Sequence, residues 1–97
     1  MRYEIQFFSD AIEDLRSVKA NARSKILDAI EQHLHYEPEK ESKSRIKQLK
    51  GLSSPQYRLR VDEYRVYYDI TANTIEIIAV VLKERSATWL EREGVKE

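Results

Sequence analysis

The chain has 97 residues, enough for one domain, and its lack of cysteine excludes a disulfide framework, a thiol nucleophile and a thiolate metal site. The 17 basic and 17 acidic residues cancel, but residues 1–39 carry 5 basic and 8 acidic side chains, residues 40–65 carry 8 and 3, and residues 66–97 carry 4 and 6. No apolar run approaches the ~20 residues of a membrane helix, so we expect a single cytoplasmic domain over residues 1–97 with no membrane segment.

The first third of the chain predicts a strand followed by two helices. Residues 2–8 alternate apolar and polar side chains, as a half-buried strand does. A helix is expected over residues 9–19, where Asp10 and Glu13 have the spacing of a capping box. A second helix is expected over residues 22–36. Its apolar stripe at helical spacing comprises Ala22, Ile26, Ala29, Ile30, His33 and Leu34.

Strand patterns dominate the rest of the chain. We expect a short strand over residues 45–49 and a loop over residues 50–56. Residues 74–82 are apolar at almost every position and rich in β-branched side chains, which is typical of a central strand covered on both faces. Residues 84–93 predict a terminal helix or turn, after which the chain end should fray. Because helices and strands are segregated, the fold class is α+β: an N-terminal strand and helix hairpin packed on a mainly antiparallel four- to five-stranded sheet, with a short C-terminal helix.

The clearest local signal is a hairpin. Residues 57–61 and 64–70 alternate, and the Asp62-Glu63 dipeptide between them has the length of a tight turn. A two-residue turn divides the hairpin side chains between two faces. The face toward the helices should hold Tyr57, Leu59, Val61, Tyr64, Val66 and Tyr68. The other face, exposed, should hold Arg58, Arg60, Arg65 and Tyr67.

Arginines therefore crowd one side of this hairpin, in the block of net charge +5 (8 basic minus 3 acidic residues over 40–65). Arg60 directly opposite Arg65 lowers stability because like charges face each other. A phosphate that accepts hydrogen bonds from two or three guanidinium groups at once would offset that cost. The alternative is an ordinary solvated face with local ion pairs to Asp69, Glu76 or Glu84. On either interpretation Arg65 points away from the core, so its removal should change stability by less than about 1 kcal/mol.

Other chemistry is sparse. His33 and His35 are two residues apart on a helix, so they point in different directions and form a poor metal pair. No metal or cofactor site is predicted. The single tryptophan, Trp89, fits a core or docking role as well as a stacking role.

Three segments resemble the RelE/ParE toxin superfamily, and the similarity extends over nearly the whole chain. They are KQLKGL at 47–52, YRLRVDEYRVYYDI at 57–70, and KERS at 83–86 after the β-branched strand. The resemblance implies the toxin half of a type II toxin–antitoxin pair, in a hetero-oligomer with a cognate antitoxin. RelE-like members cleave messenger RNA on the ribosome, whereas ParE-like members inhibit DNA gyrase.

The resemblance also implies roles for individual residues. Arg65 matches the arginine that stabilises the phosphate in the transition state, and Lys83 stands where an arginine lies beside the scissile phosphate. Trp89 falls where RelE-like enzymes carry a catalytic tyrosine. Residues expected to bind RNA are Arg58, Arg60, Lys47, Lys50 and Arg85.

Lys83 in place of an arginine and the neutral overall charge depart from the family pattern, and two further departures affect this assignment. Trp89 cannot exchange a proton as a phenol does, which leaves stacking on a base. Asp62-Glu63 replaces a turn that often contains glycine, so either Asp62, alone or together with Glu63, accepts a positive φ, or the loop is longer than two residues. The first hypothesis is a metal-independent endoribonuclease that acts on ribosome-bound messenger RNA by attack of the 2′-OH on the phosphodiester. The alternatives are a ParE-like gyrase inhibitor and a non-toxic relic that only binds antitoxin.

Overall fold

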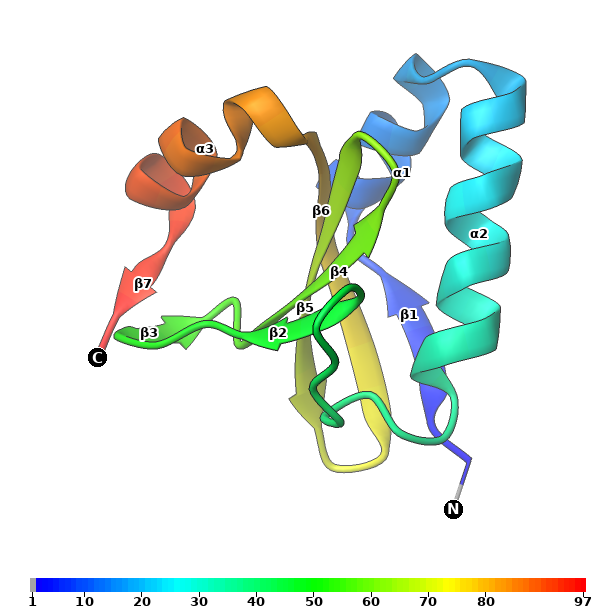
Figure 1. Cartoon of the computed structure of the whole chain (residues 1–97). Helices are drawn as coiled ribbons and strands as arrows, with labels where there is room; N and C mark the ends of the chain where they lie inside the picture. Colours follow the sequence, from blue (N-terminus) through cyan, green and yellow to red (C-terminus); the bar gives the residue numbers. More distant parts are fainter. Residues whose placement is uncertain (1) are drawn as a thin grey trace.

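The computed structural model describes residues 2–97 and contains a five-stranded sheet in the order β1-β6-β5-β4-β2 (Figure 1). The strands are β1 (Glu4–Phe7), β2 (Ile46–Gln48), β4 (Tyr57–Val61), β5 (Tyr64–Thr71) and β6 (Thr74–Leu82). β1 runs parallel to β6, and the other neighbours are antiparallel. The predicted α+β class and the central position of residues 74–82 are confirmed.

Two helices, α1 (Ser9–Ser17) and α2 (Ala20–Leu34), follow the first strand. The expected capping box is wrong: Phe8 is the N-cap of α1, and no side chain bonds the free amides there. The C-terminal end of α1 is closed instead by Arg23, whose guanidinium donates to the carbonyls of Leu15 (2.8 Å), Arg16 (3.3 Å) and Val18 (2.9 Å). This arginine satisfies carbonyls that a helix end leaves without partners.

The core lies between these helices and one face of the sheet. It contains Ala11, Leu15, Ile26, Ala29, Ile30, Leu34, Ile46, Leu59, Val61, Val66, Tyr68, Ile75, Ile77 and Val80. The α2 stripe predicted from the sequence is confirmed at four of its six positions, which are buried: Ile26, Ala29, Ile30 and Leu34. His33, by contrast, is only half-buried, while His35 is buried.

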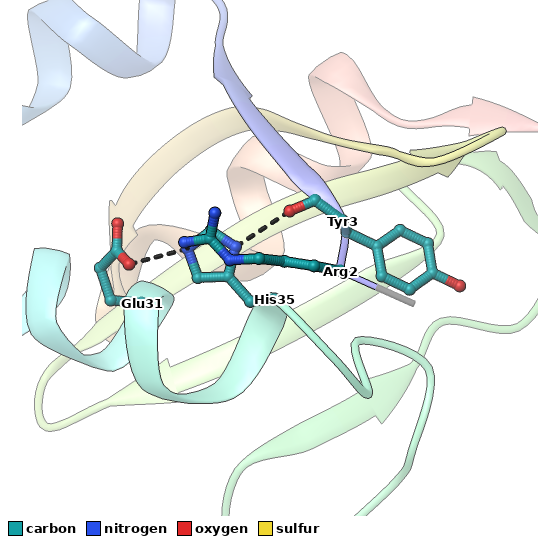
Figure 2. Close-up of polar contacts among 4 residues, drawn as sticks. All are labelled: Arg2, Tyr3, Glu31 and His35. Carbon is teal, nitrogen blue, oxygen red and sulfur yellow. Dashed lines mark hydrogen bonds and ion pairs between the residues drawn. The ribbon is translucent and has the colours of Figure 1, made fainter.

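His35 is buried at the end of α2, where it bonds to the residue that precedes β1 (Figure 2). Its carbonyl accepts the Tyr3 amide at 2.7 Å, and its Nδ1 lies 2.9 Å from the Tyr3 carbonyl. Nε2 lies 2.7 Å from a Glu31 carboxylate oxygen and 3.3 Å from an Arg2 guanidinium nitrogen. The first strand is thus held by a side chain as well as by sheet pairing.

The hairpin has the predicted register. Val61 pairs with Tyr64 and Arg60 with Arg65. Asp62 takes the expected positive φ of 52°. In the adjoining β5–β6 pair the register shifts between Tyr67 and Tyr68, which is a β-bulge.

The C-terminal segment crosses to the side of the sheet opposite α2 (Figure 1). It consists of the 3₁₀ turn η1 (Lys83–Arg85), α3 (Ser86–Glu93) and β7 (Val95–Lys96). β7 pairs with β3 (Leu52–Ser54), so the expectation that the chain end frays is wrong, and the loop over 50–56 contains a strand. None of the helices within residues 2–97 is long and apolar enough to cross a membrane.

Candidate nucleic-acid interface

Basic side chains from three adjacent strands share the sheet face opposite α2. Lys47 on β2 is paired with Arg58 on β4, which is paired with Tyr67 on β5. The next pair along the hairpin is Arg60 and Arg65. Paired residues point to the same face of a sheet, so the predicted grouping of the three arginines is confirmed.

The three arginines differ sharply in exposure. Arg60 is exposed and Arg58 is half-buried, but Arg65 is only 5% exposed. The expectation of a fully exposed arginine face is therefore wrong for Arg65. The reason is local: its Nη1 donates to the carbonyls of Asp62 and Tyr64, both at 2.9 Å, so the guanidinium folds against the hairpin turn.

The three positive charges of this cluster act on one another. Burial lowers the pKa of the Arg65 guanidinium below its ordinary value, and the charges of Arg58 and Arg60 lower it further. Tyr67 and Glu63 oppose this effect. The cluster is thus a site where positive charge is concentrated at a cost to the folded state.

No carboxylate in residues 2–97 forms an ion pair with any of the three arginines. Asp69, one of the carboxylates considered as a partner, accepts hydrogen bonds from Ser54 Oγ and the Gln56 amide instead. Within the same described range, the Nε of Arg58 is buried and lacks a hydrogen-bond partner. A polar group in this state normally carries a cost to the folded protein.

Trp89 of α3 lies on the same side of the sheet. Its ring stacks on Tyr67, with centroids 4.8 Å apart and planes 16° apart. One ring face of Trp89 is therefore already occupied by protein. The stack also buries Tyr67, whose side chain is 1% exposed.

The remaining predicted site residues are all exposed: Lys47, Lys50, Lys83 and Arg85. The Lys83 amide donates to the Glu63 carbonyl at 2.7 Å, which fixes the start of η1 beside the hairpin turn and close to Arg65. Lys50 lies in the turn after β2, where Gly51 has a φ of 81°. No cluster of three potential metal ligands occurs in the part of the chain that the structure describes.

A cleft of about 660 Å³ opens between α1 and the C-terminal segment. Its lining includes Asp14, Arg85 and Trp89. Asp14 is a residue that the sequence did not single out. Its Oδ2 accepts the Val80 amide at 2.9 Å, a contact between α1 and β6 for which one sequence carries no signal.

Comparison with known proteins defines the class of this fold and site. The family model described as "ParE toxin of type II toxin-antitoxin system, parDE" matches residues 5–87. The chain therefore belongs to the ParE toxin family, within the RelE/ParE superfamily, and is a toxin of the type II toxin–antitoxin class. A search of curated proteins found no match.

Solved structures of RelE toxins share the fold. The archaeal RelE–RelB complex from Pyrococcus horikoshii matches with a TM-score of 0.71 and 25% identity, over 88% of this chain and 99% of that chain. The RelB–RelE complex from Methanococcus jannaschii matches with a TM-score of 0.66 and 25% identity, over 86% and 95%. A double mutant of the E. coli toxin RelE in the free state matches with a TM-score of 0.69 and 19% identity, over 96% and 99%.

Proposed function

We propose that this toxin cleaves messenger RNA on the ribosome and that its arginine face holds the phosphodiester to be cut. The observation that carries the proposal is the cluster of Arg58, Arg60 and Arg65 on one face without a carboxylate partner in residues 2–97. The resemblance to the RelE/ParE superfamily, whose RelE-like members are ribonucleases, supports RNA as the polyanion. The reaction is attack of the RNA 2′-OH on the adjacent phosphate, which yields a cyclic phosphate and a free 5′-OH.

Because the arginines differ in exposure, we assign them different roles. Arg60 is exposed and contacts a phosphate oxygen directly. Arg65 lies beneath it with Nη1 held by two turn carbonyls, so it supplies a fixed positive charge as the pentacoordinate phosphate gains negative charge. Because a preorganised donor of this kind already points the right way, no free energy is needed to reorient it during the reaction. The backbone amide of Lys83 is bonded at the hairpin turn, and we expect its ammonium group to donate toward the same phosphate.

Lys47, Lys50 and Arg85 extend the positive surface on either side of the arginine cluster. They hold the flanking phosphates of the RNA strand. In-line geometry comes from the ribosome, so the isolated protein should be nearly inactive on free RNA. No residue of this scheme requires a metal ion.

The test is primer extension on messenger RNA translated in a reconstituted system. Arg60→Ala should lower the cleavage rate by roughly 10²–10³, the usual cost of one lost transition-state donor. Arg16→Ala is the matched control, because Arg16 is an exposed arginine on α1 that pairs only with Glu13 among the described residues. Cleavage by folded Arg60→Ala at the wild-type rate would contradict the proposed role of the arginine face.

A second candidate function is inhibition of DNA gyrase, which the resemblance to ParE-like members implies for a chain of the ParE toxin family. The observation that favours it is Trp89 at the C-terminal position, where a phenol would exchange a proton in an RNA-cleaving enzyme. The one phenol of the arginine face, Tyr67, is buried beneath Trp89. A supercoiling assay with the same protein preparation separates the two: gyrase inhibition without messenger RNA cleavage would favour this candidate.

We also propose a cognate antitoxin as the partner, because the P. horikoshii and M. jannaschii relatives were solved as complexes with RelB. An antitoxin that folds on binding would wrap the toxin and offer acidic side chains to its basic face. The experiment is co-expression with the small gene adjacent to the toxin gene. Relief of growth arrest supports the pairing, and persistent arrest despite production of the neighbour contradicts it.

A further inference from the structure

The cleft between α1 and the C-terminal segment is distinct from the arginine face and has the size of a small-ligand site. Its volume of about 660 Å³ lies within the 300–1,000 Å³ of typical ligand pockets. Apolar side chains of β6, including Val80 and Leu82, form part of its lining. Its charged lining residues are Asp14, Glu84, Arg85 and Arg92. Two of them are carboxylates and two are guanidinium groups, so the cleft can recognise a ligand that has both donors and an anion.

Trp89 supplies a rigid aromatic wall for this cleft. Its position is fixed because one ring face stacks on Tyr67. The side chain is half-buried and lines the cleft as well as a smaller hollow of about 370 Å³ next to it. Indole rings held in this way stack on nucleobases with about 1–3 kcal/mol of binding energy per base.

Asp14 supplies an oriented acceptor on the opposite wall. Its Oδ2 is fixed by the Val80 amide at 2.9 Å. Its other oxygen, Oδ1, accepts no hydrogen bond from residues 2–97. Asp10 on the same helix is the charged neighbour that acts on this carboxylate, and the two arginines of the C-terminal segment line the same cleft. An ionised carboxylate accepts hydrogen bonds and cannot donate them.

We propose that this cleft binds a guanine nucleotide, with the base against Trp89, the Watson–Crick edge on Asp14 and the phosphate on Arg85. Guanine presents two adjacent donors, N1–H and the N2 amino group, which match a carboxylate. Adenine and cytosine present one amino group beside an acceptor, and uracil presents one imino group between two carbonyl oxygens. Unstacked bases in RNA are commonly recognised by this edge.

The proposal rests on the proposed RNA function for one point only, which is that the nucleotide belongs to an RNA strand. It names a base preference at a subsite outside the arginine face. Binding of a free mononucleotide can be measured without the ribosome, so the two proposals fail separately. Loss of ribosomal cleavage with intact guanine binding would overturn the nuclease alone.

The chain contains a single tryptophan, so the fluorescence of the intact protein reports on Trp89 directly. Titration with GMP, AMP, CMP and UMP should give saturable quenching that is tightest for GMP and weakest for UMP. Asp14→Asn should weaken GMP binding about tenfold and remove the preference among bases. Arg85→Gln should weaken all four nucleotides by a similar factor, because it acts on the phosphate.

The control is Asp28→Asn, which removes an exposed carboxylate on α2 outside the cleft lining and should leave all four titrations unchanged. Circular dichroism melts establish that each variant is folded. The proposal would be overturned by equal affinities for the four nucleotides or by an unchanged GMP affinity in folded Asp14→Asn. It would also be overturned if no saturable quenching occurred up to a nucleotide concentration of roughly 10 mM, which would mean a binding free energy too small for a specific site. Preserved GMP selectivity in Arg85→Gln, with uniformly weaker binding, would support it.

Discussion

Replacement of Arg65 should destabilise the protein, in contrast to what its position on the outer face of the hairpin implies. The side chain is 5% exposed and donates two hydrogen bonds of 2.9 Å to the carbonyls of Asp62 and Tyr64. Hydrogen bonds from a charged donor contribute about 1.5–3 kcal/mol each. Loss of both is opposed by relief of repulsion from Arg58 and Arg60 and by recovered hydration, so a net loss of about 2 kcal/mol is expected for Arg65→Ala.

The measurement is urea denaturation at pH 7, supported by a thermal scan. For a domain of this size, about 2 kcal/mol corresponds to a fall in Tm of about 8–16 °C. Arg65→Lys should lie between Ala and wild type, because an ammonium keeps the charge but lacks the planar guanidinium that holds Nη1 against both turn carbonyls. Arg60→Ala is the matched control: it removes the opposing, exposed charge and should leave stability unchanged or slightly higher. An Arg65→Ala protein as stable as wild type would refute the structural role inferred from the turn carbonyls.

Three further predictions concern the elements around the site. A double-mutant cycle of Tyr67→Ala and Trp89→Ala should give a coupling energy of about 0.5–1.5 kcal/mol, the usual value of an aromatic pair, and a coupling near zero in urea denaturation would contradict the stack. Burial and the charge of Asp10 raise the pKa of Asp14, so protonation of its carboxyl stabilises the folded state, and that contribution is lost as pH rises through the folded-state pKa. Asp14→Asn, which can keep the Val80 bond, should therefore stabilise the protein at pH 7 and lose this advantage below about pH 4, as unfolding curves at both pH values would reveal. Arg23→Ala leaves three carbonyls at the end of α1 without their donor and should cost about 1–2 kcal/mol, which equilibrium unfolding would detect.

Periodic features of the sequence were sufficient for the sheet and the hairpin. Strict alternation over residues 57–61, with a two-residue turn, predicts the pairing of Arg60 with Arg65, and the structure has that pairing. A run of apolar residues over 74–82 predicts a strand with neighbours on both sides, and β6 lies between β1 and β5. These features follow from the geometry of strands, which one sequence expresses directly.

Features that depend on side chains meeting across the fold were not predictable in this way. Burial of Arg65 arises from carbonyls that converge at the turn, whereas alternation specifies only the face. The Asp14–Val80 contact and the Tyr67–Trp89 stack join segments more than twenty residues apart. Pairing of β7 with β3 involves strands of two and three residues, which are too short for a periodic pattern.

That small second sheet gives the C-terminal helix a mechanical property. α3 is attached to β6 at its start and to β3, through β7, at its end. None of its eight residues, all within the described range, is fully buried. A segment with so little burial stays in place because both ends are tethered, which lowers the entropy it would gain by detaching. A chain that stopped at Gly94 would hold α3 by one end only, and Trp89 would then leave Tyr67 far more often without any change in the contacts of the stack itself.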